Sequence, residues 1–136
     1  MNKDDRRISS LYYNKKSRSD KFKFKNKNEF INWYKQQGDT CHYCGIKEHV
    51  LRELIDAKKL FSKRFLKRGR HLEIERKNSS KKSNVYSKEN CVLACYFCNN
   101  DKSDVFSEDE YYNKMKSAIR IRRKLMEEKY KSLLEK

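Results

Sequence analysis

Two Cys-x-x-Cys pairs, far apart in the chain, constrain this sequence more than any other feature. The first is Cys41-His-Tyr-Cys44 and the second is Cys95-Tyr-Phe-Cys98. Each pair forms a turn that supplies two thiolates, and a tetrahedral structural zinc site needs four ligands. We therefore predict that the two pairs bind one zinc ion; the alternatives are a redox motif or a set of buried thiols. The remaining cysteine, Cys91, is expected to be a small buried residue.

The composition is that of a small domain stabilised by a bound metal. Of 136 residues, 36% are hydrophobic and 40% are charged, which leaves little apolar material for a core. A small domain of this kind usually needs a metal or disulfides. The segment MNKDDRRISS at the start has no apolar core behind its charges. No signal peptide is therefore expected, and without an export signal the paired spacing of the cysteines favours zinc over disulfides. The expected setting is intracellular, in a prokaryote or a phage. No apolar run approaches the roughly 20 residues of a membrane span.

The formal net charge of +16 predicts a polyanionic partner, for which nucleic acid is the first choice. The alternative is a ribosomal type of protein or a merely lysine-rich composition. Residues 1–27 carry ten lysines and arginines against three aspartates, with aromatic residues between them. This segment suits a basic arm on a phosphate backbone, or else a frayed terminus with a few packing contacts. Phe22 and Phe24 alternate with lysines, which permits a short strand.

Apolar spacing predicts the remaining elements in order. Helices are expected over residues 28–37 and 47–61, and a basic loop or frayed helix end over 62–70. Residues 71–76 alternate as a strand that places His71, Glu73 and Glu75 on one face. A polar loop over 77–88 leads to a second strand at 90–94 and a helix that starts within 95–98.

The C-terminal segment predicts one long amphipathic helix. Ser107-Glu-Asp-Glu110 is a capping box, and the apolar spacing continues to Leu134. Arg120 and Arg123 are candidate DNA contacts on this helix; a solvated face and a dimer interface are the alternatives. The predicted domain organisation is a basic arm, a zinc-stapled domain and this helix, at residues 1–27, 28–106 and 107–136.

The residues around the second cysteine pair resemble a known family. Asn90 precedes the pair, Asn99 follows it directly, and Lys102 stands four residues after Cys98. Glu75-Arg76 occupies the place of a carboxylate-histidine pair at the end of the first strand. In this pattern the chain resembles the HNH (His-Asn-His) endonucleases, most of all their compact, zinc-containing PacI-like branch. The resemblance covers about residues 40–106.

The resemblance implies an α+β fold, in which a small ββα-metal core is stapled by the zinc and flanked by helices. It implies an Mg²⁺- or Mn²⁺-dependent endonuclease of the restriction or homing type that acts on double-stranded DNA. Glu75 and Asn99 would bind the catalytic metal. Asn90 would orient the base or brace the loop, and Lys102 would contact phosphate or cap the site. A single ββα-metal unit cuts one strand, so a homodimer is an open alternative.

The general base departs from the family pattern. Arg76 stands where the family has its histidine, and an arginine stays protonated near neutral pH. Arg76 can instead hold the scissile phosphate as a fork. His71 is the first candidate for the base and Tyr43 the second, while Glu73 could hold a water. A non-catalytic, zinc-dependent nucleic-acid-binding module is the alternative function, with RNA-binding accessory proteins behind it.

Overall fold

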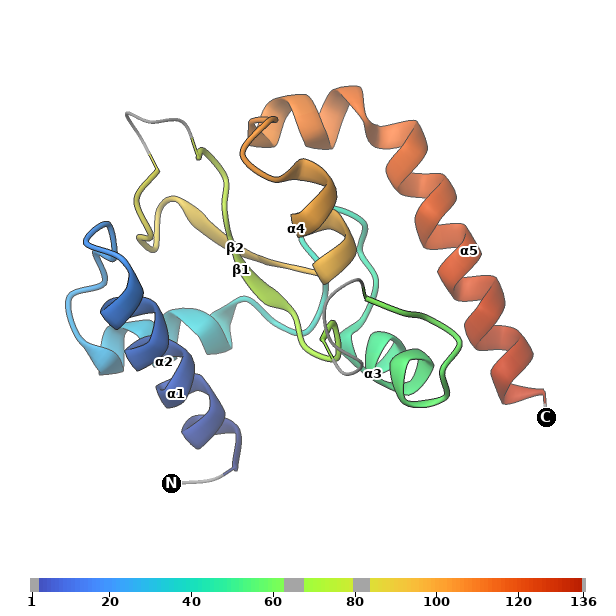
Figure 1. Ribbon diagram of the computed structural model, residues 1–136, viewed down its shortest axis with the longest axis horizontal. Helices are drawn as coiled ribbons and strands as arrows, with labels where there is room; N and C mark the ends of the chain where they lie inside the picture. The colour runs from blue at the N-terminus through green and yellow to red at the C-terminus, as the bar shows by residue number, and fades with distance from the viewer. Residues whose placement is uncertain (1–2, 63–67, 80–83, 136) are drawn as a thin grey trace. The chain divides into compact units, whose positions relative to one another are not determined.

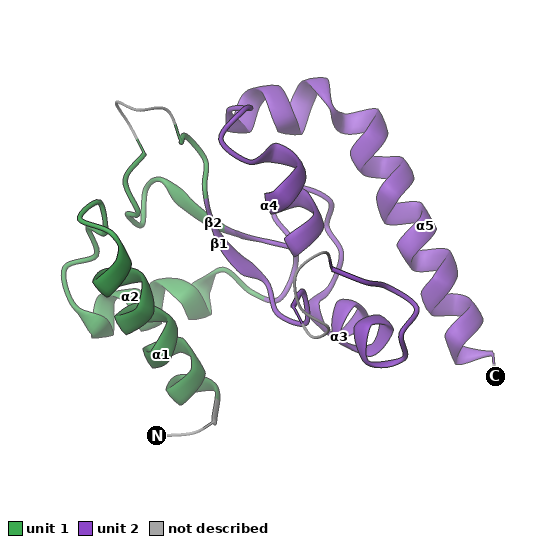
Figure 2. Ribbon diagram, viewed as in Figure 1, with its two compact units in different colours: residues 1–38, 76–92 green, residues 39–75, 93–136 purple. Residues whose placement is uncertain are grey.

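The structure is a computed structural model, and it describes residues 3–62, 68–79 and 84–135. The chain forms two compact units (Figure 2), one of residues 1–38 and 76–92 and one of residues 39–75 and 93–136. Parts of the predicted basic loop (63–67) and polar loop (80–83) lie outside the described residues. The predicted three-part domain division stays a prediction.

The first unit is built on two helices that pack together, α1 (Lys3–Arg18) and α2 (Lys27–Gln36) (Figure 1). A helix over residues 3–18 was not expected within the basic arm. Ile8 and Tyr12 explain it, because they stand four residues apart and are both buried. Tyr12 lies 5.6 Å from Phe30 of α2 between ring centroids. One narrow apolar ridge therefore folds a segment whose other positions are strongly basic.

The short strand permitted at Phe22 is present as a single parallel bridge to Tyr86. Lys23 N donates to the carbonyl of Tyr86 over 2.7 Å, and Tyr86 N donates to the carbonyl of Lys21 over 2.8 Å. This bridge joins the two sequence segments of the first unit.

The second unit holds the other helices of the described chain. Helix α3 (Glu48–Asp56) agrees with the predicted spacing and buries four apolar side chains, Val50, Leu51, Leu54 and Ile55. Helix α4 (Tyr96–Lys102) begins after Cys95, as predicted. Helix α5 (Lys116–Leu134) packs against α3 (Figure 1), where Tyr130 donates a hydrogen bond of 2.9 Å to Glu53.

The predicted long C-terminal helix is interrupted. The capping box forms, but a π-helical turn, η1 (Glu110–Lys114), follows it and α5 begins only after Met115. A π-helical turn contains an extra residue, which rotates the side chains that follow it. As a result Tyr111 is fully buried, whereas the neighbouring Tyr112 is 47% exposed.

Strands β1 (Glu73–Arg76) and β2 (Cys91–Ala94) form a two-stranded sheet. Lys77, directly after β1, donates to the carbonyl of Asn90, directly before β2, so the pair is antiparallel. The order β1, β2, α4 gives the strand–strand–helix arrangement predicted for the core. His71 lies before the start of β1, so the strand alternation does not extend to it, which corrects its expected place on the face of Glu73 and Glu75.

Candidate metal centre and active site

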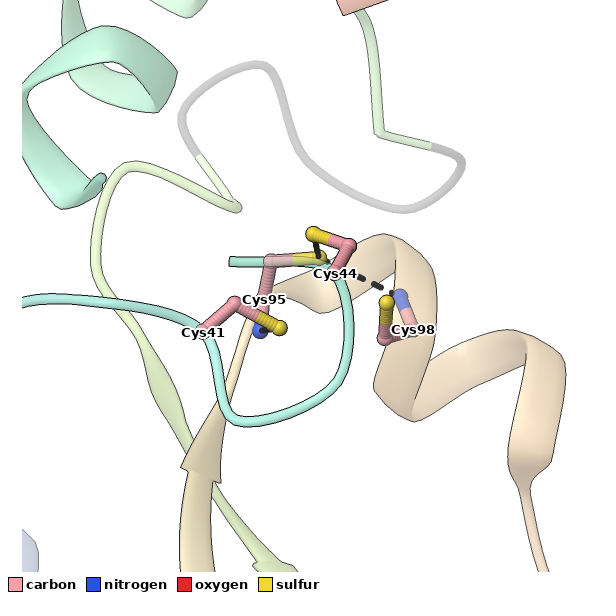
Figure 3. A group of neighbouring side chains, drawn as sticks. All are labelled: Cys41, Cys44, Cys95 and Cys98. Atoms are coloured by element: carbon pink, nitrogen blue, oxygen red, sulfur yellow. Dashed lines mark hydrogen bonds between the residues drawn. The ribbon is translucent and has the colours of Figure 1, made fainter. Parts of the chain in front are cut away.

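Four cysteines from two distant segments meet in the second unit (Figure 3). The ligand atoms of Cys41, Cys44, Cys95 and Cys98 all lie within 4.8 Å of one another, and all four residues are buried. The sulfur atoms of Cys44 and Cys95 are 3.9 Å apart. Tetrahedral zinc with Zn–S bonds of 2.3 Å requires sulfur atoms about 3.8 Å apart. The cluster can therefore hold a metal of this kind.

Backbone groups shape both cysteine turns. Gly45 N donates to the carbonyl of Cys41, and its φ of +79° is a conformation that suits glycine. In the second turn, Cys95 Sγ accepts a hydrogen bond of 3.3 Å from the amide of Cys98, and the amide of Cys95 donates to Cys41 Sγ over 3.2 Å. Such donors stabilise thiolates, which are the form that binds metal.

Beside this cluster, β1 and α4 are connected by two pairs of polar side chains. Asn99 Nδ2 donates to Glu73 Oε1 over 3.0 Å, and this pair is half-buried. Lys102 Nζ lies 2.8 Å from Glu75 Oε1, and this pair is enclosed, since Lys102 is 0% and Glu75 4% exposed. Glu73 and Glu75 are two residues apart on β1, and Asn99 and Lys102 are three apart on α4. Each spacing places its two side chains on one face, so both pairs lie side by side where β1 faces α4.

The second oxygen of Glu75 is also occupied. Tyr43 donates its hydroxyl proton to Glu75 Oε2 over 2.5 Å. Burial, and then the hydrogen bond to Glu75, raise the pKa of Tyr43 far above its ordinary value. The phenol therefore stays protonated at neutral pH, where it acts as a donor to Glu75.

The accessible carboxylate, Glu73, lies in a small hollow of about 170 Å³ with Asn99 and Arg68. Arg68 Nε is 3.1 Å from Glu73 Oε2, and this hydrogen bond raises the pKa of Arg68. The bond from Asn99 uses its amide nitrogen, so its amide oxygen, the atom that a metal would bind, is not part of that contact. From the sequence, Glu73 is expected only to hold a water, because strand alternation does not distinguish it from Glu75.

His71 lies near the helix α3 in the same unit. Its Nδ1 is 3.7 Å from Glu48 Oε1, and the neighbouring amide of Leu72 donates to Glu48 Oε2 over 2.8 Å. Glu48 thus holds the chain segment that leads into β1.

Asn90 and Arg76 belong to the first unit. Asn90 Nδ2 donates to the carbonyls of Asn78 (2.9 Å) and Val85 (2.8 Å), and Asn90 Oδ1 accepts from the amide of Asn78 (3.1 Å). Of the two roles expected for Asn90, these bonds match the bracing of the loop. The segment between β1 and β2 is held at both ends by this one side chain.

Arg76 contacts Tyr86, a residue for which no role was expected. Its guanidinium carbon lies 4.7 Å from the ring centroid of Tyr86, and its Nη1 donates to the carbonyl of Asn84. The ammonium of Lys15 lies 5.0 Å from the same ring. A tyrosine in a polar loop gives no sequence signal, and only the fold brings it to Arg76.

The two arginines proposed for DNA contact differ. Arg123 is bound to Glu127 (2.7 Å) and to the carbonyl of Cys44 (3.0 Å). Both arginines are exposed and line, with Lys116, the same hollow of about 300 Å³ beside Cys44.

The comparison with solved structures found a similar protein, the rare-cutting HNH restriction endonuclease PacI. That protein is described as perturbing DNA by an extraordinary mechanism. The two chains are 28% identical and superpose with a TM-score of 0.61, over 87% of this chain and 75% of that one. This chain resembles the HNH endonucleases. That confirms the resemblance and the α+β, four-cysteine fold predicted from the sequence. The likeness supports a nuclease family.

No protein-family model matches this chain, and no curated protein does either. Among the residues that the structure describes, no helix combines the length and apolar character needed to cross a membrane.

Proposed function

We propose that this protein is a metal-dependent HNH endonuclease that hydrolyses phosphodiester bonds in double-stranded DNA, in a restriction or homing role. The observation that carries the proposal is the half-buried pair of Glu73 and Asn99 on the β1–β2–α4 unit, next to the four-cysteine cluster. The likeness to PacI supports it. In this proposal a zinc ion at the cysteines is structural and holds β2 and α4 in place.

The catalytic Mg²⁺ or Mn²⁺ would bind between α4 and β1. When bound, the ion would stabilise the charge on the leaving oxygen and the scissile phosphate. Asn99 would supply one ligand. The family pattern assigns the carboxylate ligand to Glu75, whereas burial favours Glu73. Lys102 and Tyr43 hold both oxygens of the enclosed Glu75. Asn99 and Arg68 hold the oxygens of Glu73, but this group is partly exposed, so Arg68 can turn to solvent when a metal binds. A divalent ion on Glu75 would need to displace the Lys102 ammonium from a buried carboxylate.

Three side chains are candidates for activating the water. His71 is the first from the sequence. Tyr43 is disfavoured, because its raised pKa keeps it protonated. Tyr86 is added because its ring contacts Arg76, the residue in the place of the family histidine. Arg76 itself would hold the scissile phosphate.

Exposed cations of the protein would form the surface that binds DNA. Lys102 is fully buried against Glu75, so we propose that it supports the site from within. Arg120 and Lys116 line an open hollow and are better placed for phosphate contact. With a net charge of +16, the affinity for DNA should fall steeply as salt increases.

The second candidate function is a nucleic-acid-binding module without catalysis. The arginine at position 76 and the occupied oxygens of Glu75 favour it. It shares the zinc site and the basic surface with the nuclease, so only strand cleavage separates the two functions.

The deciding experiment incubates supercoiled plasmid with the protein and Mg²⁺, Mn²⁺ or EDTA. We expect metal-dependent nicking that Asn99→Ala abolishes and that the matched neighbour Asn100→Ala retains. Binding without strand breaks at large protein excess would establish the second function instead. Glu73→Gln and Glu75→Gln, compared at increasing Mg²⁺, identify the carboxylate ligand, because loss of a ligand raises the metal concentration needed for cutting.

The base is tested with His71→Ala, Tyr43→Phe and Tyr86→Phe over a range of pH. In the variant that lacks the base, the rate of cutting should fall strongly, and the remaining rate should no longer rise with pH. We expect Tyr43→Phe to retain that limb. Its disappearance in Tyr43→Phe would return Tyr43 to the role of base.

A further inference from the structure

Arg122, on the helix α5, is bonded directly to a cysteine of the four-cysteine cluster. Its Nη2 lies 2.9 Å from Cys98 Sγ and 2.7 Å from the hydroxyl of Tyr111, and its Nη1 lies 3.2 Å from Asp101 Oδ2. The side chain is 25% exposed. The guanidinium of Arg122 is therefore directed at the candidate metal centre.

The charge of the cluster explains an arginine at this position. A Zn²⁺ ion with four thiolates carries a net charge of about −2, which is costly to bury without compensation. Backbone amides donate to Cys41 and Cys95, but they are neutral. Arg122 adds a full positive charge at Cys98. A hydrogen bond from a charged group is roughly twice as strong as a neutral one.

Arg122 in turn depends on anions close to it. Its Nε is buried without a hydrogen-bond partner, so the guanidinium has lost water that nearby anions must offset. The carboxylate of Asp101 is 42% exposed and partly screened. The Cys98 sulfur is fully buried and supplies a stronger field when it is a thiolate.

A second arginine fastens the same helix to the other cysteine turn. Arg123 Nη1 donates to the carbonyl of Cys44 over 3.0 Å. The fit is close, since a methyl group on Gly45 would lie 2.6 Å from that nitrogen. Arg123 contacts the backbone of its turn, whereas Arg122 contacts a sulfur atom, so the two contributions can be separated.

We propose that Arg122 is an outer-sphere ligand of the zinc site, which lowers the charge on the Cys98 thiolate and couples the docking of α5 to metal binding. The inference rests on the zinc ion of the proposed function. Removing an outer-sphere partner typically weakens metal affinity about 10- to 100-fold. Loss of Arg122 should therefore speed the release of zinc, and loss of zinc should loosen α5.

The test measures the transfer of zinc from the purified protein to a chromogenic chelator. Arg122→Met and Arg122→Gln should release zinc about 10-fold faster or more, while Lys124→Met, an exposed cation on the same helix, should release it at the wild-type rate. Arg122→Gln also serves if Arg122→Met does not fold. Release at the wild-type rate from both Arg122 variants would overturn the proposal. A wild-type protein without zinc would instead overturn the zinc site itself.

Cobalt substitution separates an effect on the sulfur from a loosened helix. A hydrogen bond to a thiolate raises the energy of its charge-transfer band to Co²⁺. We expect this band to shift to lower energy in Arg122→Gln and to stay in place in Arg123→Met, which frees α5 only from the Cys44 carbonyl. An identical band in wild type and Arg122→Gln would show that Arg122 acts on the helix alone and would refute the outer-sphere role.

Discussion

At the scale of single residues, the two glutamates of β1 show how surroundings decide a role. Glu73 and Glu75 are chemically identical and point to the same side of the strand. Glu75 is enclosed by Tyr43 and Lys102, whereas Glu73 is only half-buried and is bonded to Asn99 and Arg68. The alternation of the strand predicted the shared side correctly. It could not predict which carboxylate is covered, because Tyr43 comes from a turn 32 residues earlier.

The buried ion pair gives a prediction for stability. Lys102→Met should lower the free energy of unfolding by about 3–5 kcal/mol, because it leaves the Glu75 carboxylate buried without its cation. Urea denaturation of the zinc-loaded protein measures the loss. The double variant with Glu75→Gln should regain part of it, since the uncompensated charge is then removed. A Lys102→Met protein as stable as wild type would contradict the burial of this pair.

Two glycines form a matched pair for the contact between Arg123 and the first cysteine turn. Gly38 and Gly45 both have φ of +79°, but a methyl group at Gly38 meets no atom within 4 Å. Gly38→Ala should therefore cost only the left-handed strain of about 1–2 kcal/mol. Gly45→Ala should cost more, because Arg123 must also move. Equal losses in thermal or urea unfolding would show that Arg123 does not press on this turn.

At the scale of elements, periodicity predicted what depends on local apolar spacing. Helices α2 and α4 and both strands lie within a few residues of their predicted places, whereas α3 ends at Asp56, before the end predicted at residue 61. Helix α1 was missed because its buried ridge is narrow and the rest of the segment is basic. The π-helical turn was missed because the order of Tyr111 and Tyr112 does not reveal a shift of one residue in register. The shift accompanies two hydrogen bonds of the Tyr111 hydroxyl, which donates to Asp101 and accepts from Arg122.

The capping box before η1 gives a prediction for pH. Hydrogen bonds from Ser107, first its backbone amide, lower the pKa of Glu110. A carboxylate with a lowered pKa stabilises the fold above its unfolded pKa of about 4.3 and loses that effect as the pH falls through the folded value. The difference in unfolding free energy between wild type and Glu110→Gln should therefore stay constant from pH 7 to pH 5. A difference that shrinks across this interval would contradict the assignment.

At the scale of the whole molecule, a metal ion at the four cysteines would add to the stability that the buried apolar side chains provide. Chelation of zinc under reducing conditions should remove hydrogen-exchange protection from the helices and strands of residues 39–62, 68–75 and 93–134. Structural zinc contributes about 10–16 kcal/mol of apparent binding free energy in small zinc domains. Trp33, the single tryptophan of the sequence, is buried in the first unit and reports on that unit separately by fluorescence. Full protection without zinc would refute the structural role.

The sequence predicted the cysteine cluster at this scale because ligand spacing is a local property. It did not predict the division into two units, whose boundaries fall inside β1 and β2. Nor did it predict that α5 reaches the cluster. Arg122 and Arg123 read as surface charge, and their contacts depend on packing between segments up to 79 residues apart.

The separation of the two cysteine turns also has a consequence for synthesis. Cys44 and Cys95 are 51 positions apart. At translation rates of about 5–20 residues per second, the first turn emerges roughly 3–10 seconds before its partner. During that interval the nascent chain carries two thiols with half of a metal site. A site of four thiolates can therefore form only if the first turn stays reduced until the second arrives, and α5, which contacts both turns through Arg122 and Arg123, follows them in the chain.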